Sequence, residues 1–124
     1  MKKIYHLAVE STLDIIAGKW KLSILCNLGN STMRTGELLR AMPGVSQRVL
    51  TKQLRELEEE GIIDRRSYNE VPPRVEYSLT DEGKSLREIL VMMSEWGKAH
   101  IAKQQSEGAE VQLLNDNDDG FRNM

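Results

Sequence analysis

The segment from Ser46 to Gly61 constrains the fold of this chain more than any other stretch of its sequence. Ser46 is suited to cap the start of a helix, because its hydroxyl can accept a hydrogen bond from a backbone N–H of the first turn. Gly61 is suited to end that helix, because glycine readily adopts the left-handed backbone found beyond a last turn. Between the two, apolar residues recur at helical spacing. This spacing predicts an amphipathic helix whose buried stripe is Val49, Leu50, Leu54 and Leu57.

The opposite face of the predicted helix carries cations and no acid. It consists of Gln47, Arg48, Thr51, Lys52 and Arg55, whereas the acids Glu56, Glu58, Glu59 and Glu60 all lie toward the C-terminal end. A helix dipole favours the reverse order, so helix stability does not account for this distribution. Helices that enter the major groove of DNA present hydrogen-bond donors near their N-terminus. Two interpretations therefore stand at this point: a DNA-contacting helix, or an ordinary charged helix on the surface.

A shorter helix and a tight turn are predicted immediately before this segment. Thr35 is a suitable N-cap for a helix over 36–41, and Pro43 with Gly44 favours a turn before Ser46. Two further helices are expected upstream, over 9–17 and 20–29. A short helix, a turn and a longer helix in succession form a helix-turn-helix pattern. On this interpretation Arg34 or Thr35 contacts a DNA phosphate.

The hydrophobic period changes from helical to alternating after Gly61. Residues 62–68 and 75–79 are typical of strands, and Pro72 with Pro73 between them excludes a helix. Two strands directly after a helix-turn-helix predict a β-hairpin "wing". Three arginines flank its tip, where they could meet phosphates or enter a minor groove; they are Arg65, Arg66 and Arg74. The alternative is that these arginines are merely solvated.

A long last helix is predicted from the cap at Thr80 to about Ile101. Its apolar stripe includes Leu86, Ile89, Leu90, Met93, Trp96 and Ile101. A domain of this size has little core left for so much apolar surface, which favours burial against a partner subunit. The alternative is that the helix folds back onto its own core.

The charge of the chain is distributed unevenly. Residues 105–124 contain five acids and one arginine, a net charge of −4, so residues 1–104 carry +2 of the overall −2. A local basic face matters more for nucleic-acid binding than the sum of charges does. We therefore expect one domain over residues 1–104, followed by an acidic and disordered tail over residues 105–124.

The sequence also indicates a compartment. No apolar run approaches the roughly 18 residues needed to span a membrane, and acids at Glu10 and Asp14 interrupt any signal-peptide pattern. Cys26 is the one cysteine among 124 residues, which excludes an internal disulfide and fits a reducing cytoplasm. We interpret Cys26 as a small buried side chain rather than a redox sensor. A cytoplasmic protein without membrane association is predicted.

Residue patterns for catalysis, metal binding or cofactor binding are lacking. His6 and His100 lie at opposite ends of the chain, and with Cys26 they form no metal-ligand spacing. No glycine-rich phosphate loop and no nucleophile elbow occur. The sequence therefore predicts a protein that is not an enzyme and that needs no metal or cofactor.

Four stretches of the chain resemble the HxlR-type family of bacterial winged-helix regulators, which are related to MarR-type repressors. They are TLDIIAGKWKLSIL over 12–25, RTGELLRAMPGVSQRVLTKQLRELEEEGII over 34–63, RRSYNEVPPRVEYSLTDEGKSL over 65–86, and the Trp96-Gly97 pair. The VPPRVEYSLTDEG segment is the most specific of these. The resemblance covers about Val9 to Ile101.

The resemblance implies a homodimer that binds double-stranded operator DNA. Ser46 to Leu57 would be the recognition helix, and Asn69 to Val75 would be the wing. The first and last helices would form the dimer, which adds Leu7 and Leu13 to the predicted interface. Gly18-Lys19-Trp20 matches a family signature, in which we interpret Trp20 as packing and Lys19 as a backbone contact.

One departure from the family concerns the response to a signal. Many members carry a cysteine followed by proline just before the first helix, and some of them sense thiol-reactive compounds. Here those positions are Leu7 and Ala8, so thiol switching at that place is excluded, although a small-molecule effector is compatible with the class. The predicted fold is mainly α with a small β-hairpin, a winged helix-turn-helix. The alternative function is a winged-helix module that binds proteins and not DNA.

Overall fold

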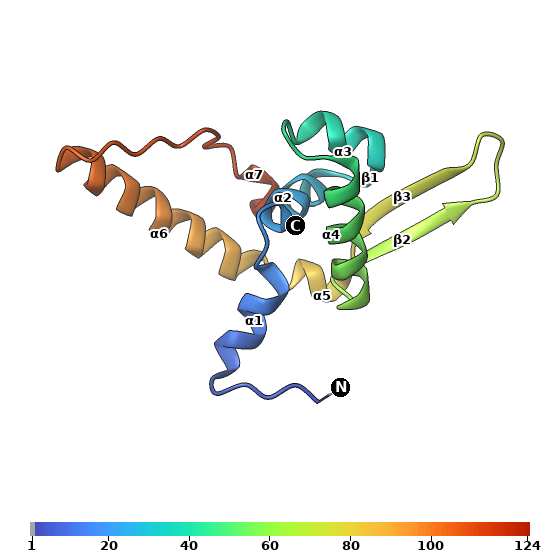
Figure 1. Ribbon diagram of the computed structural model, residues 1–124, viewed down its shortest axis with the longest axis horizontal. Helices are drawn as coiled ribbons and strands as arrows, with labels where there is room; N and C mark the ends of the chain where they lie inside the picture. Colours follow the sequence, from blue (N-terminus) through green and yellow to red (C-terminus); the bar gives the residue numbers. More distant parts are fainter. Residues whose placement is uncertain (1) are drawn as a thin grey trace.

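The computed structural model describes residues 2–124 as a set of helices around a small antiparallel sheet (Figure 1). The elements in chain order are α1 (Ala8–Ile16), α2 (Lys21–Asn30), β1 (Met33–Arg34), α3 (Thr35–Ala41), α4 (Gln47–Glu59), β2 (Ile63–Tyr68), β3 (Arg74–Leu79), α5 (Asp81–Lys84), α6 (Arg87–Ser106) and α7 (Asp119–Arg122). The sheet has the strand order β1-β3-β2. This is the predicted winged helix-turn-helix architecture, mainly α with a β-hairpin.

Helix α2 lies at the centre of the core. Ile24 and Leu25 are fully buried, and the apolar faces of α3 and α4 pack around them through Leu38, Leu50 and Leu54. The sheet closes this core with buried side chains from its inner face. Removal of these apolar side chains from water is the main force that holds the elements together.

Both ends of α4 form as the sequence predicts. The backbone N–H of Val49 donates to Ser46 Oγ at 3.1 Å, and Gly61 has a φ of +74° after the last turn. Leu50, Leu54 and Leu57 are buried, but Val49 is 36% exposed, so its assignment to the buried stripe was wrong. The stripe is narrower than predicted because three leucines at spacings of four and three already fill the space under the helix.

The start of α3 also differs slightly from the prediction. Thr35 is the first residue of the helix and not its cap, because the backbone N–H of Arg34 donates to the Glu37 carboxylate at 3.0 Å. Met33 and Arg34 form the short strand β1, which the sequence analysis did not predict. Met33 pairs with Tyr77 of β3, so the strand depends on a partner far along the chain.

The predicted last helix is divided in two. The Thr80 hydroxyl caps α5 by accepting a hydrogen bond from the N–H of Gly83 at 3.0 Å, and a turn at Ser85 and Leu86 precedes α6. Leu86 and Leu90 are buried in the core of the single chain, at 8% and 2% exposure. Their assignment to the dimer interface is therefore corrected: these two side chains join α6 to the body of the domain.

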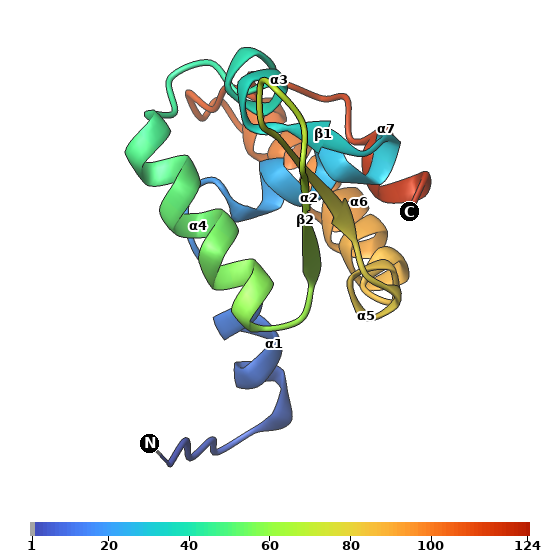
Figure 2. The ribbon, with the colours of Figure 1, turned by 90° about the vertical axis from the view of Figure 1, so that its right-hand side faces the viewer.

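Helices α1 and α6 extend away from the body in different directions (Figures 1 and 2). Their surfaces carry the large exposed apolar side chains Leu7, Leu13, Ile89, Met93 and Trp96, while Ile101 is half-buried. These six residues remain available as the predicted dimer interface.

The C-terminal end of the acidic segment is ordered, contrary to the prediction of a disordered tail. After Ser106 the chain runs back beside α6, and α7 packs against α2 (Figure 1). Phe121 is buried in the hydrophobic core. Phe121 and Met124 pack against the core and several polar contacts join them, so the last turn docks despite the acidic composition around it.

Candidate nucleic-acid interface

The cation-bearing face of α4 is fully presented to solvent. The five side chains predicted for DNA contact on this helix are all exposed, and together they line one shallow hollow; they are Gln47, Arg48, Thr51, Lys52 and Arg55. The Ser46 cap uses a side-chain hydroxyl to fix the first turn, so Ser46 positions the helix. The face therefore offers three cations, one amide and one hydroxyl with no competing acid.

The wing adds one arginine to this surface. A second hollow, beside the first, is lined by Thr51, Arg55, Glu58, Arg65 and Tyr77, so Arg65 of β2 lies next to Arg55 of α4. Glu58 marks the acidic end of the helix and limits the basic surface there. The structure thus brings the recognition helix and the first strand of the wing into one continuous basic surface.

The other predicted arginines lie on the opposite face of the sheet. Directly paired residues of neighbouring strands share a face. Glu76 of β3 pairs with Arg34 of β1 on one side and Arg66 of β2 on the other, whereas Arg65 pairs with Tyr77. Successive residues in a strand alternate between faces. Arg34 and Arg66 are therefore separated from Arg65 by the thickness of the sheet, although both are exposed.

Arg74 has partners within the wing itself. Its guanidinium lies 3.1 Å from the Glu70 carboxylate, and its Nε lies 3.4 Å from Glu76 Oε1 in an ion pair without hydrogen-bond alignment. It also stacks on the Tyr68 ring at 3.8 Å, with 27% of the side chain exposed. The prediction treated Arg74 as a free cation at the tip. The structure instead shows a brace that holds the two strands together.

Thr35 contributes little exposed polar surface. It is half-buried at the first position of α3. This helix contacts both α2 and α4 (Figure 1). A phosphate contact by Thr35 would have to involve its backbone N–H at the start of the helix.

A partly buried ion pair that the sequence did not predict fixes α4 to α2. Lys21 is 7% exposed, and its Nζ donates to Glu56 Oε2 at 2.7 Å. The hydrogen bond and charge of Lys21 lower the pKa of the Glu56 carboxyl. The pattern contained a signal: Lys21 occupies the same face of α2 as Ile24, Leu25 and Leu28, where a charge requires a partner.

Other site types have no support in residues 2–124. No group of His, Cys, Asp and Glu side chains there could hold a metal ion. No helix in that range is long and apolar enough to cross a bilayer. The basic surface of α4 and β2 is the candidate site because it brings together cations that the sequence predicts for DNA contact.

Comparison with known proteins agrees with this geometry. The HxlR-like helix-turn-helix family matches residues 15–105. The chain is 54% identical over 100 residues to YtcD, an HTH-type transcriptional regulator of Bacillus subtilis (strain 168), across 81% of this chain and 79% of YtcD. It is 47% identical over 107 residues to an HTH-type transcriptional regulator of Methanothermobacter thermautotrophicus, across 86% of this chain and 82% of that protein.

Solved structures give the same result. The redox regulator HypR in its reduced form superposes with a TM-score of 0.76 at 45% identity, across 81% of this chain and 99% of HypR. A MarR-family transcriptional regulator from Enterococcus faecalis V583 superposes with a TM-score of 0.73 at 44% identity, across 86% of this chain and 96% of that chain. The family consists of regulators and not enzymes, and DNA binding is favoured over the protein-interaction alternative. The chain belongs to the HxlR-like helix-turn-helix family of DNA-binding transcriptional regulators.

Proposed function

We propose that this regulator is a cytoplasmic homodimer that binds a pseudo-palindromic operator, with α4 of each subunit in a major groove. The observation that supports this proposal most strongly is the acid-free, exposed face of α4, joined by Arg65 of the wing. Two copies related by a two-fold axis would present two such faces to one side of a duplex.

The residues near the start of α4 are assigned to base recognition. An arginine at position 48 can donate two hydrogen bonds to guanine, and Gln47 can pair in the same way with adenine. Thr51 and Lys52 follow one turn later on the same face. These four side chains would carry the sequence information in the complex.

The cations farther along the surface are assigned to the DNA backbone. Arg55 and Arg65 lie together beyond the base-reading residues, where phosphates flank the groove. Arg34 and Arg66, on the outer face of the sheet, would meet phosphate only if the wing enters a minor groove edge-on. Arg74 is assigned to the shape of the wing, since its charge is already paired.

The dimer is assigned to the surfaces of α1 and α6. Leu7, Leu13, Ile89, Met93 and Trp96 are exposed apolar side chains on two elements that extend from the body. Burial of such side chains against a second copy would remove apolar surface from water. Helices α4 and α6 lie on different sides of the domain (Figure 2), so the basic face of α4 and the apolar surface of α6 can be used together.

The replacement of Arg48 by alanine tests the assignment of α4. We expect Arg48→Ala to weaken operator binding by about 1–3 kcal/mol and to relax the preference at one base pair, because a bidentate contact is lost. The measurement is fluorescence anisotropy titration of the operator and of single-base variants at fixed salt. Lys103→Ala serves as the control, since this exposed lysine of α6 lies far from α4 and is expected to leave binding unchanged. Equal losses on operator and random duplex would contradict base recognition by Arg48.

A further inference from the structure

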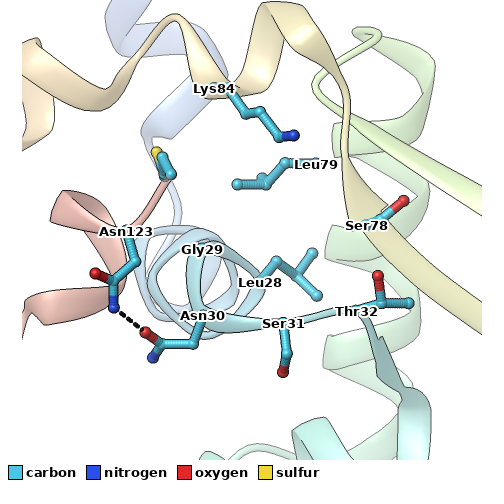
Figure 3. A pocket seen from close by; sticks show the side chains of 10 residues that line it. Leu28, Gly29, Asn30, Ser31, Thr32, Ser78, Leu79, Lys84 and Asn123 are labelled. Atoms are coloured by element: carbon cyan, nitrogen blue, oxygen red, sulfur yellow. Dashed lines mark hydrogen bonds between the residues drawn. The ribbon is translucent and has the colours of Figure 1, made fainter.

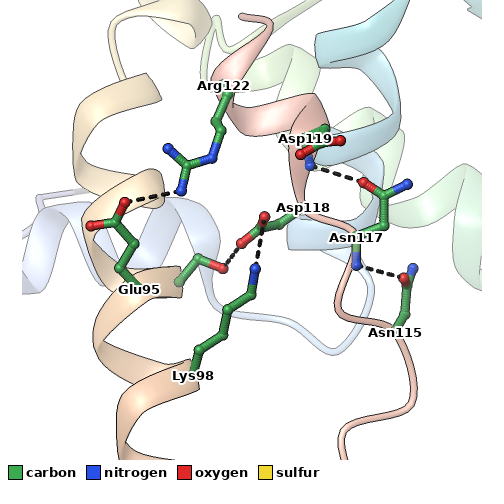
Figure 4. Close-up of polar contacts among 8 residues, drawn as sticks. Glu95, Lys98, Asn115, Asn117, Asp118, Asp119 and Arg122 are labelled. Carbon is green, nitrogen blue, oxygen red and sulfur yellow. Dashed lines mark hydrogen bonds and ion pairs between the residues drawn. The ribbon is translucent and has the colours of Figure 1, made fainter.

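Residues 118–123, here called the C-terminal strap, bind to α6 through hydrogen bonds and ion pairs. Asp118 accepts hydrogen bonds from Ser94 Oγ and from Lys98 Nζ, the latter at 3.2 Å. Arg122 donates to the Glu95 carboxylate at 2.9 Å (Figure 4), and its carbonyl oxygen accepts from Arg87 Nε at 2.8 Å. The strap thus contacts one side of α6 over about three turns, from Arg87 to Lys98.

The same strap docks onto α2 through apolar packing and backbone proximity. Phe121 is buried in the core, and Asn123 Nδ2 donates to Asn30 Oδ1 at 2.7 Å (Figure 3). Gly29 of α2 and Gly120 of the strap face each other so closely that a Cβ on either would overlap backbone atoms of the other segment or of Cys26. Because glycine has no side chain, the backbones of α2 and the strap can approach this closely at Gly29 and Gly120.

The orientation of α6 relative to the body depends on the strap more than on any other described element. In residues 2–124, α7 is the element against which α6 packs most, while Leu90 fixes only the base of α6 in the core. The rest of α6 extends away from the body beside the returning chain (Figure 1). Without the strap, α6 would be held to the DNA-reading body mainly at one end.

We propose that the C-terminal strap sets the angle between α6 and the α2–α4 body, and thereby the spacing between the two recognition helices of the dimer. This inference rests on the proposed function. It concerns residues 118–123, which lie outside the family match at 15–105. A rigid arrangement makes binding of the second half-site intramolecular at high effective concentration, whereas a loose one allows several spacings at lower affinity.

Two substitutions displace the strap by independent means. Gly120→Ala introduces a Cβ where the carbonyl of Cys26 lies, and Phe121→Ala removes the buried anchor. Leu114→Ala is the matched control. It truncates an apolar side chain that precedes the strap in the chain and is 87% exposed. Phe121→Ala removes a core side chain and could prevent folding. Gly120→Ala leaves every core side chain in place, so the strap can still be tested with this variant.

Alkylation of Cys26 by monobromobimane reports strap docking without DNA. This residue is the one cysteine in the chain, and the strap lies directly over it. The strap covers the half-buried thiol, and burial raises the pKa of that thiol although the backbone N–H groups of Gly120 and Phe121 lower it; the docked protein therefore reacts slowly with a reagent that needs an accessible thiolate. We expect faster alkylation in both strap variants and an unchanged rate in Leu114→Ala. Wild-type rates in both strap variants would overturn the docking and the inference with it.

The spacing role is tested on duplexes whose two half-sites are moved apart by about half a helical turn, roughly 5 bp. We expect the wild type and Leu114→Ala to prefer the natural spacing by about tenfold or more, and both strap variants to retain only about threefold preference. Binding to a single half-site should be equal in all four proteins. Faster alkylation with an unchanged spacing preference would overturn the inference while leaving the proposed function intact. A wild type that binds no duplex would overturn the proposed function, and the spacing role with it.

Discussion

At the scale of single residues, Lys21 shows how the orientation of α4 is fixed. A lysine in the buried face of α2 would be costly on its own, and Glu56 of α4 supplies the compensating charge at 2.7 Å. The Glu56 side chain is 39% exposed, so solvent screens part of this attraction. The pair therefore specifies how α4 lies on α2 more than it stabilises the fold.

Replacement of Glu56 and replacement of Lys21 should lower the free energy of unfolding by different amounts. Glu56→Ala leaves Lys21 buried without a partner and should lower the free energy of unfolding by about 1–2 kcal/mol. Lys21→Met should cost less, because an apolar side chain suits the buried position. Urea unfolding followed by circular dichroism measures both, with the exposed Glu59→Ala as the control. A larger loss for Lys21→Met would contradict the assignment.

The same pair has a predictable pH dependence. Because the pKa of Glu56 is lower in the folded state than its ordinary value of 4.5, its contribution is complete above that value. The contribution is lost as the pH falls through the lowered folded-state pKa. The stability difference between wild type and Glu56→Ala should therefore be constant near neutral pH and should shrink in acid. A difference that grows in acid would have the wrong sign.

At the scale of elements, local signals predict most of what positions the candidate site. Ser46, Gly61 and the leucine stripe define α4 because a cap, a stop and a helical period all act within one short segment. The hairpin is defined in the same way by alternation around Pro72 and Pro73. Side chains that face solvent beside these signals, such as Arg48 and Lys52, follow directly from the helical period.

Elements that depend on distant partners could not be predicted from local patterns. The strand β1 has two residues and exists because Met33 pairs with Tyr77. The docking of α7 requires close backbone contact between Gly29 and Gly120. These residues lie far apart in the sequence, so no local pattern predicts their contact. The pairing of Arg74 with Glu70 and Glu76 likewise depends on how the hairpin closes. The disordered tail that composition alone predicted is therefore wrong for the end of the chain.

The two kinds of arginine in the wing should differ in their effect on salt dependence. Arg65→Ala should reduce the slope of log K against log salt concentration by about 0.9, because one phosphate contact is lost. Arg74→Ala should change the slope less, since its charge is already paired within the hairpin. Titrations of the operator at several salt concentrations measure both slopes. A larger change for Arg74→Ala would show that the brace opens to contact DNA.

At the scale of the whole molecule, the surface proposed to bind DNA is separate from the surfaces proposed to form the dimer. The basic face of α4 and Arg65 lies on one side, and the apolar surfaces of α1 and α6 extend elsewhere (Figures 1 and 2). Asp118 is held against Ser94 and Lys98 of α6, and α7, which begins at Asp119, packs on α2 and α6. This separation keeps negative charge off the surface that is proposed to meet DNA.

The dimer surface is tested by introducing a charge at its most exposed aromatic residue. Trp96 is 69% exposed and stacks on His100 at a centroid distance of 4.9 Å. We expect Trp96→Lys to weaken dimerisation by about tenfold or more, because a central aromatic contact is replaced by a charge. Sedimentation velocity over a range of concentrations measures this change, and Glu110→Ala, at an exposed residue beyond α6, should behave as the wild type. An unchanged dimer would remove Trp96 from the interface.

Hydroxyl-radical footprinting on a bound genomic fragment shows whether two α4 helices read successive grooves of one operator. We expect two protected patches of related sequence, with centres about 10 bp or a multiple of that apart. Both patches should weaken together with Arg48→Ala. A single asymmetric patch, or protection that Arg48→Ala leaves unchanged, would contradict this expectation.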